Sequence, residues 1–121
     1  MSIHKDLDVW KSAINHAKNV YIITDGYPKN EIYGITSQMR RASVSIGSNI
    51  AEGAARQSTR EFIRFLFIAL GSASELDTLV EISYITNLYE KSKLNALQNE
   101  NERISRMIQG LIKNLKDKSN Y

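Results

Sequence analysis

The chain has 121 residues and a mass of 13.7 kDa, the usual size of one domain, so residues 1–121 are expected to form a single folded unit. Hydrophobic residues make up 42% and charged residues 24%, proportions that exclude a disordered or collagen-like chain. The absence of cysteine excludes disulfides, thiolate metal sites and a cysteine nucleophile, and a net charge of +3 is too small to identify a partner.

The distribution of apolar residues argues against a membrane protein. The longest uncharged runs, 42–51 and 65–74, have ten residues each, about half of what a membrane-spanning helix needs. Charged residues, among them Lys5, Asp6 and Asp8, stand where a signal peptide would be apolar. We therefore expect a cytoplasmic protein with no membrane partner.

One proline and the lack of alternating β-type runs predict an all-α protein. The first helical pattern ends before Asp25, where Gly26 suits a left-handed helix stop and Pro28 suits the start of the next element. Apolar or small side chains at spacings of three and four predict the buried stripe of this helix: Leu7, Trp10, Ile14, Ala17, Tyr21 and Thr24.

Three more helices follow from the same periodicity. The second predicted stripe is Ile32, Ile35, Met39, Ala42, Ile46 and then Asn49 or Ile50, and it ends near Gly53. Ser58 followed by Glu61 is a capping box that predicts the start of a third helix, which ends around Asn87. The third stripe is Phe62, Leu66, Ala69, Ala73, Leu76, Val80 and Ser83. The fourth is Leu94, Leu97, Ile104, Ile108, Leu111 and Leu115, with Asn101 interrupting it.

Four helices joined by short connections predict an antiparallel up-down-up-down four-helix bundle, because short loops force neighbouring helices to run in opposite directions. A polar tail from Lys116 to Tyr121 is expected to fray.

The third helix is apolar around almost its whole circumference between Phe62 and Leu70. One stripe would be enough for a lone bundle, and an exposed apolar patch of this size is rare on a monomer. We infer that this surface packs on another subunit, with a longer neighbouring helix or the folded tail as the alternative cover. The interface candidates are Ile63, Phe67, Ile68 and Leu70.

Five glycines fall inside or at the ends of the predicted helices, where an interior glycine costs about 1 kcal/mol relative to alanine. They are Gly34, Gly47, Gly53, Gly71 and Gly110. Gly47 lies on a flank of small residues, and Gly71 begins a Gly-Ser-Ala-Ser run. Both stretches predict close helix contacts.

No pattern in the sequence supports catalysis, a metal site or a cofactor. The Glu-x-x-His pairs of di-iron bundles are absent, and His4 and His16 are expected on the surface. Hydrolase motifs are also absent, and the acidic residues Glu75, Asp77 and Glu81 are expected to form a solvated face. We therefore expect a protein that is not an enzyme.

One side of the second helix is polar, with Arg41, Ser45, Ser48, Asn49, Glu52 and Arg56 on it. We interpret this side as a hydrogen-bond network between helices that fixes their register. Its predicted members are Asn49 and Glu52, with Ser72 or Glu75 on the third helix as their partners.

Charge is segregated along the chain. Residues 38–70 carry five arginines against two glutamates, residues 71–90 carry four acidic residues and no lysine or arginine, and residues 91–121 carry seven basic against three acidic residues. The basic stretches either solvate helix faces or contact phosphates. The candidates for nucleic-acid binding are Arg40, Arg41, Arg56, Arg60, Arg64, Arg103, Arg106 and Lys113.

Several motifs together resemble one known family. The segments 37–53, which contains Asn-Ile-Ala-Glu-Gly, and 69–76, which contains Gly-Ser-Ala-Ser-Glu-Leu, are the most specific. Arg60-Glu61-Phe62, the opening Leu-x-Val-Trp and the Tyr-Pro-Lys-x-Glu turn extend the match over residues 6–115. The chain resembles the bacterial four-helix bundle family encoded in intervening sequences of 23S ribosomal RNA genes.

The chain is also similar to the accessory protein of diversity-generating retroelements. That protein is a positively charged bundle that assembles as a homopentamer and associates with reverse transcriptase and nucleic acid. The resemblance therefore implies a ring-like homopentamer whose partners are RNA or DNA and, by analogy, a protein such as a reverse transcriptase.

Two hypotheses follow. The first is a non-enzymatic homo-oligomer that associates with nucleic acid or nucleoprotein, because ring symmetry would multiply a weak basic patch on each subunit. The second is a protein interaction scaffold that binds no nucleic acid and uses its arginines for ion pairs between subunits.

Overall fold

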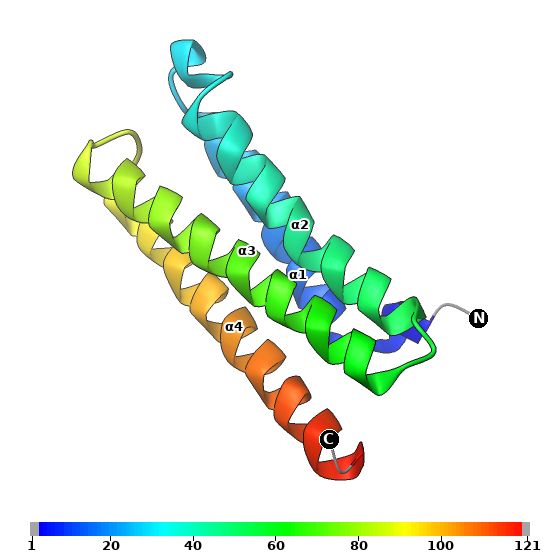
Figure 1. Cartoon of the computed structure of the whole chain (residues 1–121). Helices are drawn as coiled ribbons and strands as arrows, with labels where there is room; N and C mark the ends of the chain where they lie inside the picture. Colours follow the sequence, from blue (N-terminus) through cyan, green and yellow to red (C-terminus); the bar gives the residue numbers. More distant parts are fainter. Residues whose placement is uncertain (1–2, 120–121) are drawn as a thin grey trace.

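The computed structural model describes residues 3–119, which fold into four α-helices and no strand. The helices are α1 (Asp8–Thr24), α2 (Ile35–Ala55), α3 (Thr59–Ile85) and α4 (Lys91–Ser119), and short 3₁₀ helices at Ile3–Asp6 and Lys29–Glu31 precede α1 and α2. Successive helices run in opposite directions (Figure 1). Each helix packs on the two beside it, and α1 lies diagonally across from α3. This packing is compatible with the predicted bundle.

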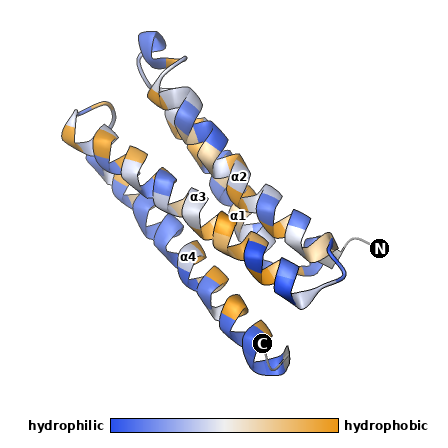
Figure 2. Ribbon diagram, in the orientation of Figure 1, coloured by the Kyte–Doolittle hydropathy of each residue, from blue (hydrophilic) through white to orange (hydrophobic). Residues whose placement is uncertain are grey.

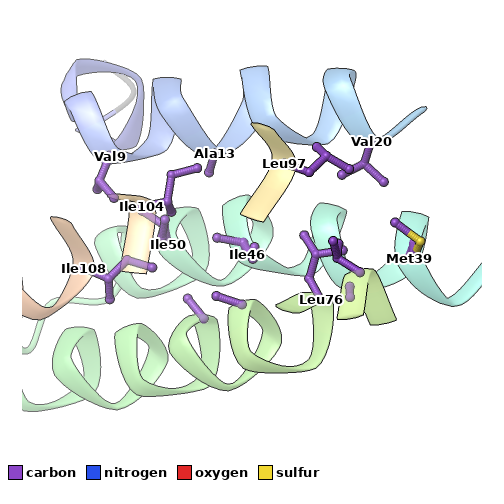
Figure 3. Packing of buried hydrophobic residues seen from close by; sticks show 14 of the residues in the cluster. Val9, Ala13, Val20, Met39, Ile46, Ile50, Leu76, Leu97, Ile104 and Ile108 are labelled. Carbon is purple, nitrogen blue, oxygen red and sulfur yellow. The ribbon is translucent and has the colours of Figure 1, made fainter. Parts of the chain in front are cut away.

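The core lies along the axis of the four helices, where apolar stripes face one another (Figures 2 and 3). The predicted stripes of α2, α3 and α4 are confirmed at most positions: Met39, Ile46, Leu66, Leu76, Leu94 and Ile104 are fully buried. Burial of a side chain of this size stabilises the fold by roughly 1.5–3 kcal/mol.

The predicted stripe of α1 was right only in part. Thr24 is buried and Leu7 and Trp10 pack on the core, as predicted. Ile14 and Tyr21 are exposed, and the buried residues of this helix are Val9, Ala13, His16, Val20 and Thr24. The apolar arc of α1 is wide enough to contain two adjacent stripes of similar hydrophobicity. The stripe that is buried passes through a histidine, so a search for apolar residues alone selects the other one.

Both ends of α3 are fixed by local hydrogen bonds. The predicted cap at Ser58 is confirmed, because the Glu61 backbone N–H donates to its Oγ at 3.2 Å. At the other end the Leu88 N–H donates to the Ser83 carbonyl at 3.0 Å, and Asn87 takes the left-handed conformation with a φ of 56°. Asparagine tolerates this conformation, and the pattern is a Schellman motif.

The prediction of a left-handed stop at Gly26 was wrong, since no glycine in the described residues has a positive φ. Glycine is needed there because the Tyr89 ring comes so close that a Cβ would lie 2.5 Å from its Cε1. Tyr89 also packs on Tyr27, with ring centroids 5.8 Å apart. Burial raises the pKa of Tyr27.

Two other boundaries differ from the prediction. α2 begins at Ile35, so Ile32 precedes the helix and is exposed. α4 continues to Ser119, so the expected frayed tail is helical beyond Lys116, and its last residues, 120–121, lie outside the described residues. Asn101 does not interrupt the buried stripe of α4, because the residue is itself buried there.

The glycines divide into two groups. A Cβ at Gly47 would meet Ile14 Cδ1 of α1 at 3.2 Å, and one at Gly53 would meet Phe65 Cβ of α3 at 2.8 Å. The contact at Gly47 is the one that its flank of small residues predicted. Gly71 and Gly110 have nothing within 4 Å, and the contact predicted for the run that Gly71 begins is made by Ser72, which meets Ser45, and by the buried Ala73.

We expect Gly53→Ala and Gly110→Ala to have opposite effects on the free energy of unfolding. The first forces α2 away from α3 and should lower it by about 1–3 kcal/mol. The second adds a good helix former in open space and should raise it by up to about 1 kcal/mol. Urea unfolding followed by circular dichroism at one protein concentration measures both, and equal effects would contradict the close contact at Gly53.

Candidate nucleic-acid interface

Three of the candidate arginines surround the turn between α2 and α3. Arg56 is the C-cap of α2, and Arg60 and Arg64 lie in the first turns of α3. The guanidinium carbons of Arg56 and Arg64 lie 5.0 and 4.6 Å from the centroid of the buried Phe65 ring, a cation–π distance. All three arginines are exposed.

Two carboxylates accompany these arginines. Arg64 donates from Nε and an Nη2 N–H to the two oxygens of Glu61, at 3.1 and 3.2 Å. This hydrogen bond, with Arg56 and Arg60 nearby, lowers the pKa of Glu61, and the same contact raises the pKa of Arg64. Glu52 Oε1 lies 3.7 Å from Arg56 Nη2, too far for a hydrogen bond.

Arg40 and Arg41 lie in the other half of α2, apart from this turn. Arg40 donates from Nε to the Thr24 Oγ1 at 2.9 Å, and its guanidinium carbon is 4.8 Å from the Tyr21 ring centroid. Arg41 lines a hollow of about 280 Å³ together with Glu75 of α3. The structure therefore does not bring the basic residues of segment 38–70 together at one place.

The candidate nucleic-acid-binding residues on α4 are exposed. Arg103 donates to Ser12 Oγ of α1 at 3.4 Å, and Arg106 pairs with Glu102 at 2.6 Å. Lys113 is exposed. The last turns of α4 run beside the start of α3, where Lys116 Nζ lies 5.4 Å from the Phe67 ring centroid.

Charge differs between the two ends of the bundle. The end with the α2–α3 turn contains residues 3–14, 50–70 and 103–119, which carry ten basic and five acidic residues (Figure 1). The opposite end contains residues 15–49 and 71–102, which carry six basic and eight acidic residues. The antiparallel helices thus convert segregation along the sequence into a molecule with one basic end and one acidic end.

Only part of the predicted oligomer surface is exposed. Ile63 is 1% exposed and belongs to the core of its own chain, and Leu70 is half-buried against that core. The placement of Ile63 was wrong because α3 packs on both α2 and α4, which cover a wide arc of it. Phe67 and Ile68 remain 52% and 40% exposed, even though α4 extends over this region.

Further along the same side of α3, Ile82 and Ile85 are also exposed. Gly71, Glu75 and Thr78 lie between them and Ile68, so the apolar surface of α3 is interrupted. A second exposed apolar group lies between α1 and α2. There Tyr21 and Val44 line one hollow, and Ile14 rests on Gly47.

Part of the expected polar network joins α2 to α3. The Ser45 and Ser72 hydroxyls are 2.8 Å apart, and the Asn49 amide donates to the Ser45 carbonyl and hydroxyl at 2.8 and 3.0 Å. Glu52 lies at the side of Arg56, and Glu75 lines the hollow beside Arg41. Ser45 thus links Asn49 on its own helix to Ser72 on α3.

A second polar cluster was missed from the sequence. His16, expected on the surface, is fully buried, with Nδ1 2.5 Å from Glu100 Oε1 and Nε2 3.0 Å from Asn101 Oδ1. The Asn101 amide donates to the Ala73 carbonyl of α3 at 2.8 Å, and Asn19 donates to Glu100. One signal in the sequence could have found this cluster. His16 and Asn101 each stand among the apolar residues of a buried stripe, and two such polar residues can hydrogen-bond to each other.

Residues 3–119 contain no group of acidic and histidine side chains that could hold a metal ion. None of the helices in this part of the chain is long and apolar enough to cross a membrane.

Comparison with known proteins agrees with this fold. The sequence profile of the family described as 23S rRNA-intervening sequence protein matches residues 5–110. A solved structure of a protein of unknown function from the S23 ribosomal protein family of Bacteroides thetaiotaomicron is similar, with a TM-score of 0.80 and 26% identity. The similarity covers 87% of this chain and 98% of that chain. A search of curated proteins gave no significant match.

We expect Asn101→Leu to lower the free energy of unfolding by about 2–4 kcal/mol, because it leaves the Ala73 carbonyl and the His16 ring buried without their partner. The control Asn99→Leu, at an exposed position of the same helix, should change it by less than about 0.5 kcal/mol. Urea unfolding at one protein concentration compares them. Equal stability of the two variants would show that the cluster does not hold the helices together.

Proposed function

Because this chain belongs to the 23S rRNA-intervening sequence protein family, we propose that it acts as a non-enzymatic homo-oligomer that associates with nucleic acid or nucleoprotein. The observation that carries the proposal is the difference in charge between the two ends of the bundle. The protein acts in the cytoplasm, and its subunits form a pentameric ring. By analogy with the retroelement accessory protein, a reverse transcriptase is a further candidate partner.

The exposed apolar surfaces support a ring. They differ from each other: one is the α3 surface of Phe67 and Ile68, and the other is the α1–α2 group of Ile14, Tyr21 and Val44. Contact between unlike surfaces is head-to-tail, and such contacts close into rings when the rotation per subunit fits. A contact between identical surfaces would instead stop at a dimer.

Ring symmetry gives the charge difference a function. In a cyclic assembly every subunit has the same orientation relative to the ring axis, so the basic ends of all subunits lie at equivalent positions on one side of the ring, separate from the acidic ends. Each subunit contributes ten basic residues against five acidic on that side. A nucleic acid that contacts several subunits at once binds far more tightly than it would bind to one subunit alone.

One observation favours the alternative, a scaffold for protein partners. Arg64 and Arg106 already pair with carboxylates of their own helices, which reduces the charge that they offer to a phosphate. In the scaffold hypothesis the arginines also pair with neighbouring subunits. Arg60→Glu with Arg64→Glu would then dissociate the assembly, whereas nucleic-acid binding predicts an intact assembly that no longer holds RNA.

We expect Ile68→Glu to reduce the assembled mass to that of a monomer, since it places a charge in the apolar contact. The control Ile22→Glu changes an exposed isoleucine on α1 outside both proposed surfaces and should leave the mass unchanged. Light scattering measures the mass, and circular dichroism verifies the helix content. If the parent protein itself has the mass of a monomer, the proposed ring is wrong.

We expect the parent protein to bind structured RNA at about 50 mM salt and to lose most of that affinity by about 200 mM, because the contacts are with phosphates. Fluorescence anisotropy with a labelled RNA hairpin measures both. No binding at the lower salt, or the same affinity at both, would contradict the nucleic-acid function and favour the scaffold.

A further inference from the structure

We propose that the turn between α2 and α3 is the phosphate-binding site of this protein, formed by Arg56, Arg60 and Arg64, and that Arg40 and Arg41 take no part in binding. The ligand is the sugar–phosphate backbone of a nucleic acid, of any sequence. This inference rests on the proposed function and specifies which part of the surface performs it.

Phe65 gives this turn a preorganised shape. Phe65 is only 9% exposed and packs beside Gly53 of α2, outside the main core cluster. The guanidinium carbons of Arg56 and Arg64 lie 5.0 and 4.6 Å from the centroid of its ring. A free arginine side chain loses considerable conformational entropy when it binds a ligand. Stacking on a fixed ring removes part of that freedom before the ligand arrives, so less is lost on binding.

The neighbouring carboxylates orient these arginines and leave donors available. A guanidinium has five N–H groups, and Glu61 accepts from two of those on Arg64, which leaves three for a ligand. The Glu52 contact to Arg56 is longer than a hydrogen bond, so all of the donors of Arg56 remain. Arg60 has no hydrogen bond or ion pair among the described residues.

Two further features of this turn favour an anion. α3 begins at Thr59, and the backbone dipoles of its 27 residues place partial positive charge at the same turn. The last turns of α4, with exposed Lys113, run beside the start of α3. Both features add to the field at the arginines.

Arg40 and Arg41 lack these properties. The Arg40 guanidinium is committed to the buried Thr24 hydroxyl and to the Tyr21 ring. Arg41 shares its hollow with Glu75, whose negative charge repels a phosphate. Both residues also lie at the end of the bundle where acidic residues outnumber basic ones.

The same geometry determines what is recognised. Reading of single-stranded bases needs exposed aromatic faces for stacking, and Phe65 is buried beneath the two guanidinium groups. The nearby Phe67 is exposed, but Lys116 lies over its ring and the residue belongs to the proposed contact between subunits. Arginine forks match phosphate oxygens and, without contacts to base edges, carry no sequence information. We therefore expect equal affinity for RNA and DNA duplexes of unrelated sequence.

The test compares two double variants with the same change in charge. Arg56→Gln with Arg60→Gln alters the turn and leaves the Arg64–Glu61 pair in place. The matched control is Lys91→Gln with Lys93→Gln, at two exposed positions in the first turn of α4, at the opposite end of the bundle. Labelled RNA and DNA duplexes report affinity by anisotropy at about 50 and 200 mM salt. Light scattering and circular dichroism measure the assembly and the folding of each variant. If the turn variant unfolds, Arg60→Gln alone replaces it in the comparison, because the Arg60 side chain contacts no core residue.

We expect the turn variant to lose at least about tenfold in affinity for both duplexes and to show a weaker salt dependence, with the assembly intact. The control should stay within about threefold of the parent protein. Equal losses in both variants, or no loss in the turn variant, would overturn the site while leaving nucleic-acid binding in place. A parent protein that binds neither duplex would overturn the proposed function itself.

Discussion

Asn101 joins three of the four helices, and the register of the bundle depends on it. From α4 its amide reaches the Ala73 carbonyl of α3, and its oxygen meets the His16 ring of α1. The Ser45–Ser72 contact then ties α2 to α3. Apolar packing is tolerant of small shifts along a helix, whereas a buried polar group left without a partner is costly. These few contacts therefore select one alignment of the helices.

That alignment gives the molecule its charged ends. With the helices in register, the arginines at the start of α3 lie beside the basic end of α4, and the acidic half of α3 lies at the opposite end. The Ser58 cap fixes where α3 begins and so where Arg60 and Arg64 stand. The basic segments of the sequence gather at one end of the molecule only because neighbouring helices run antiparallel.

Much of the fold could be predicted from periodicity and capping residues. The four helices and the start of α3 at Ser58 depend on spacings and hydrogen bonds within a few residues, and both were predicted correctly. The stripe of α1 and the burial of Ile63 were not. The burial of these residues depends on which neighbouring helices cover them, and the sequence of one helix does not show which helices those are.

The number of helices, the start of α3, the family resemblance and the segregation of charge could all be read from the sequence alone, because capping, spacing and composition act within a few residues. Only the tertiary structure decided that His16 and Asn101 satisfy each other, and that Arg56 and Arg64 share the Phe65 ring while Arg40 lies elsewhere. The reason is physical: a polar or charged side chain acquires its role from the atoms that meet it, and those atoms come from distant parts of the chain.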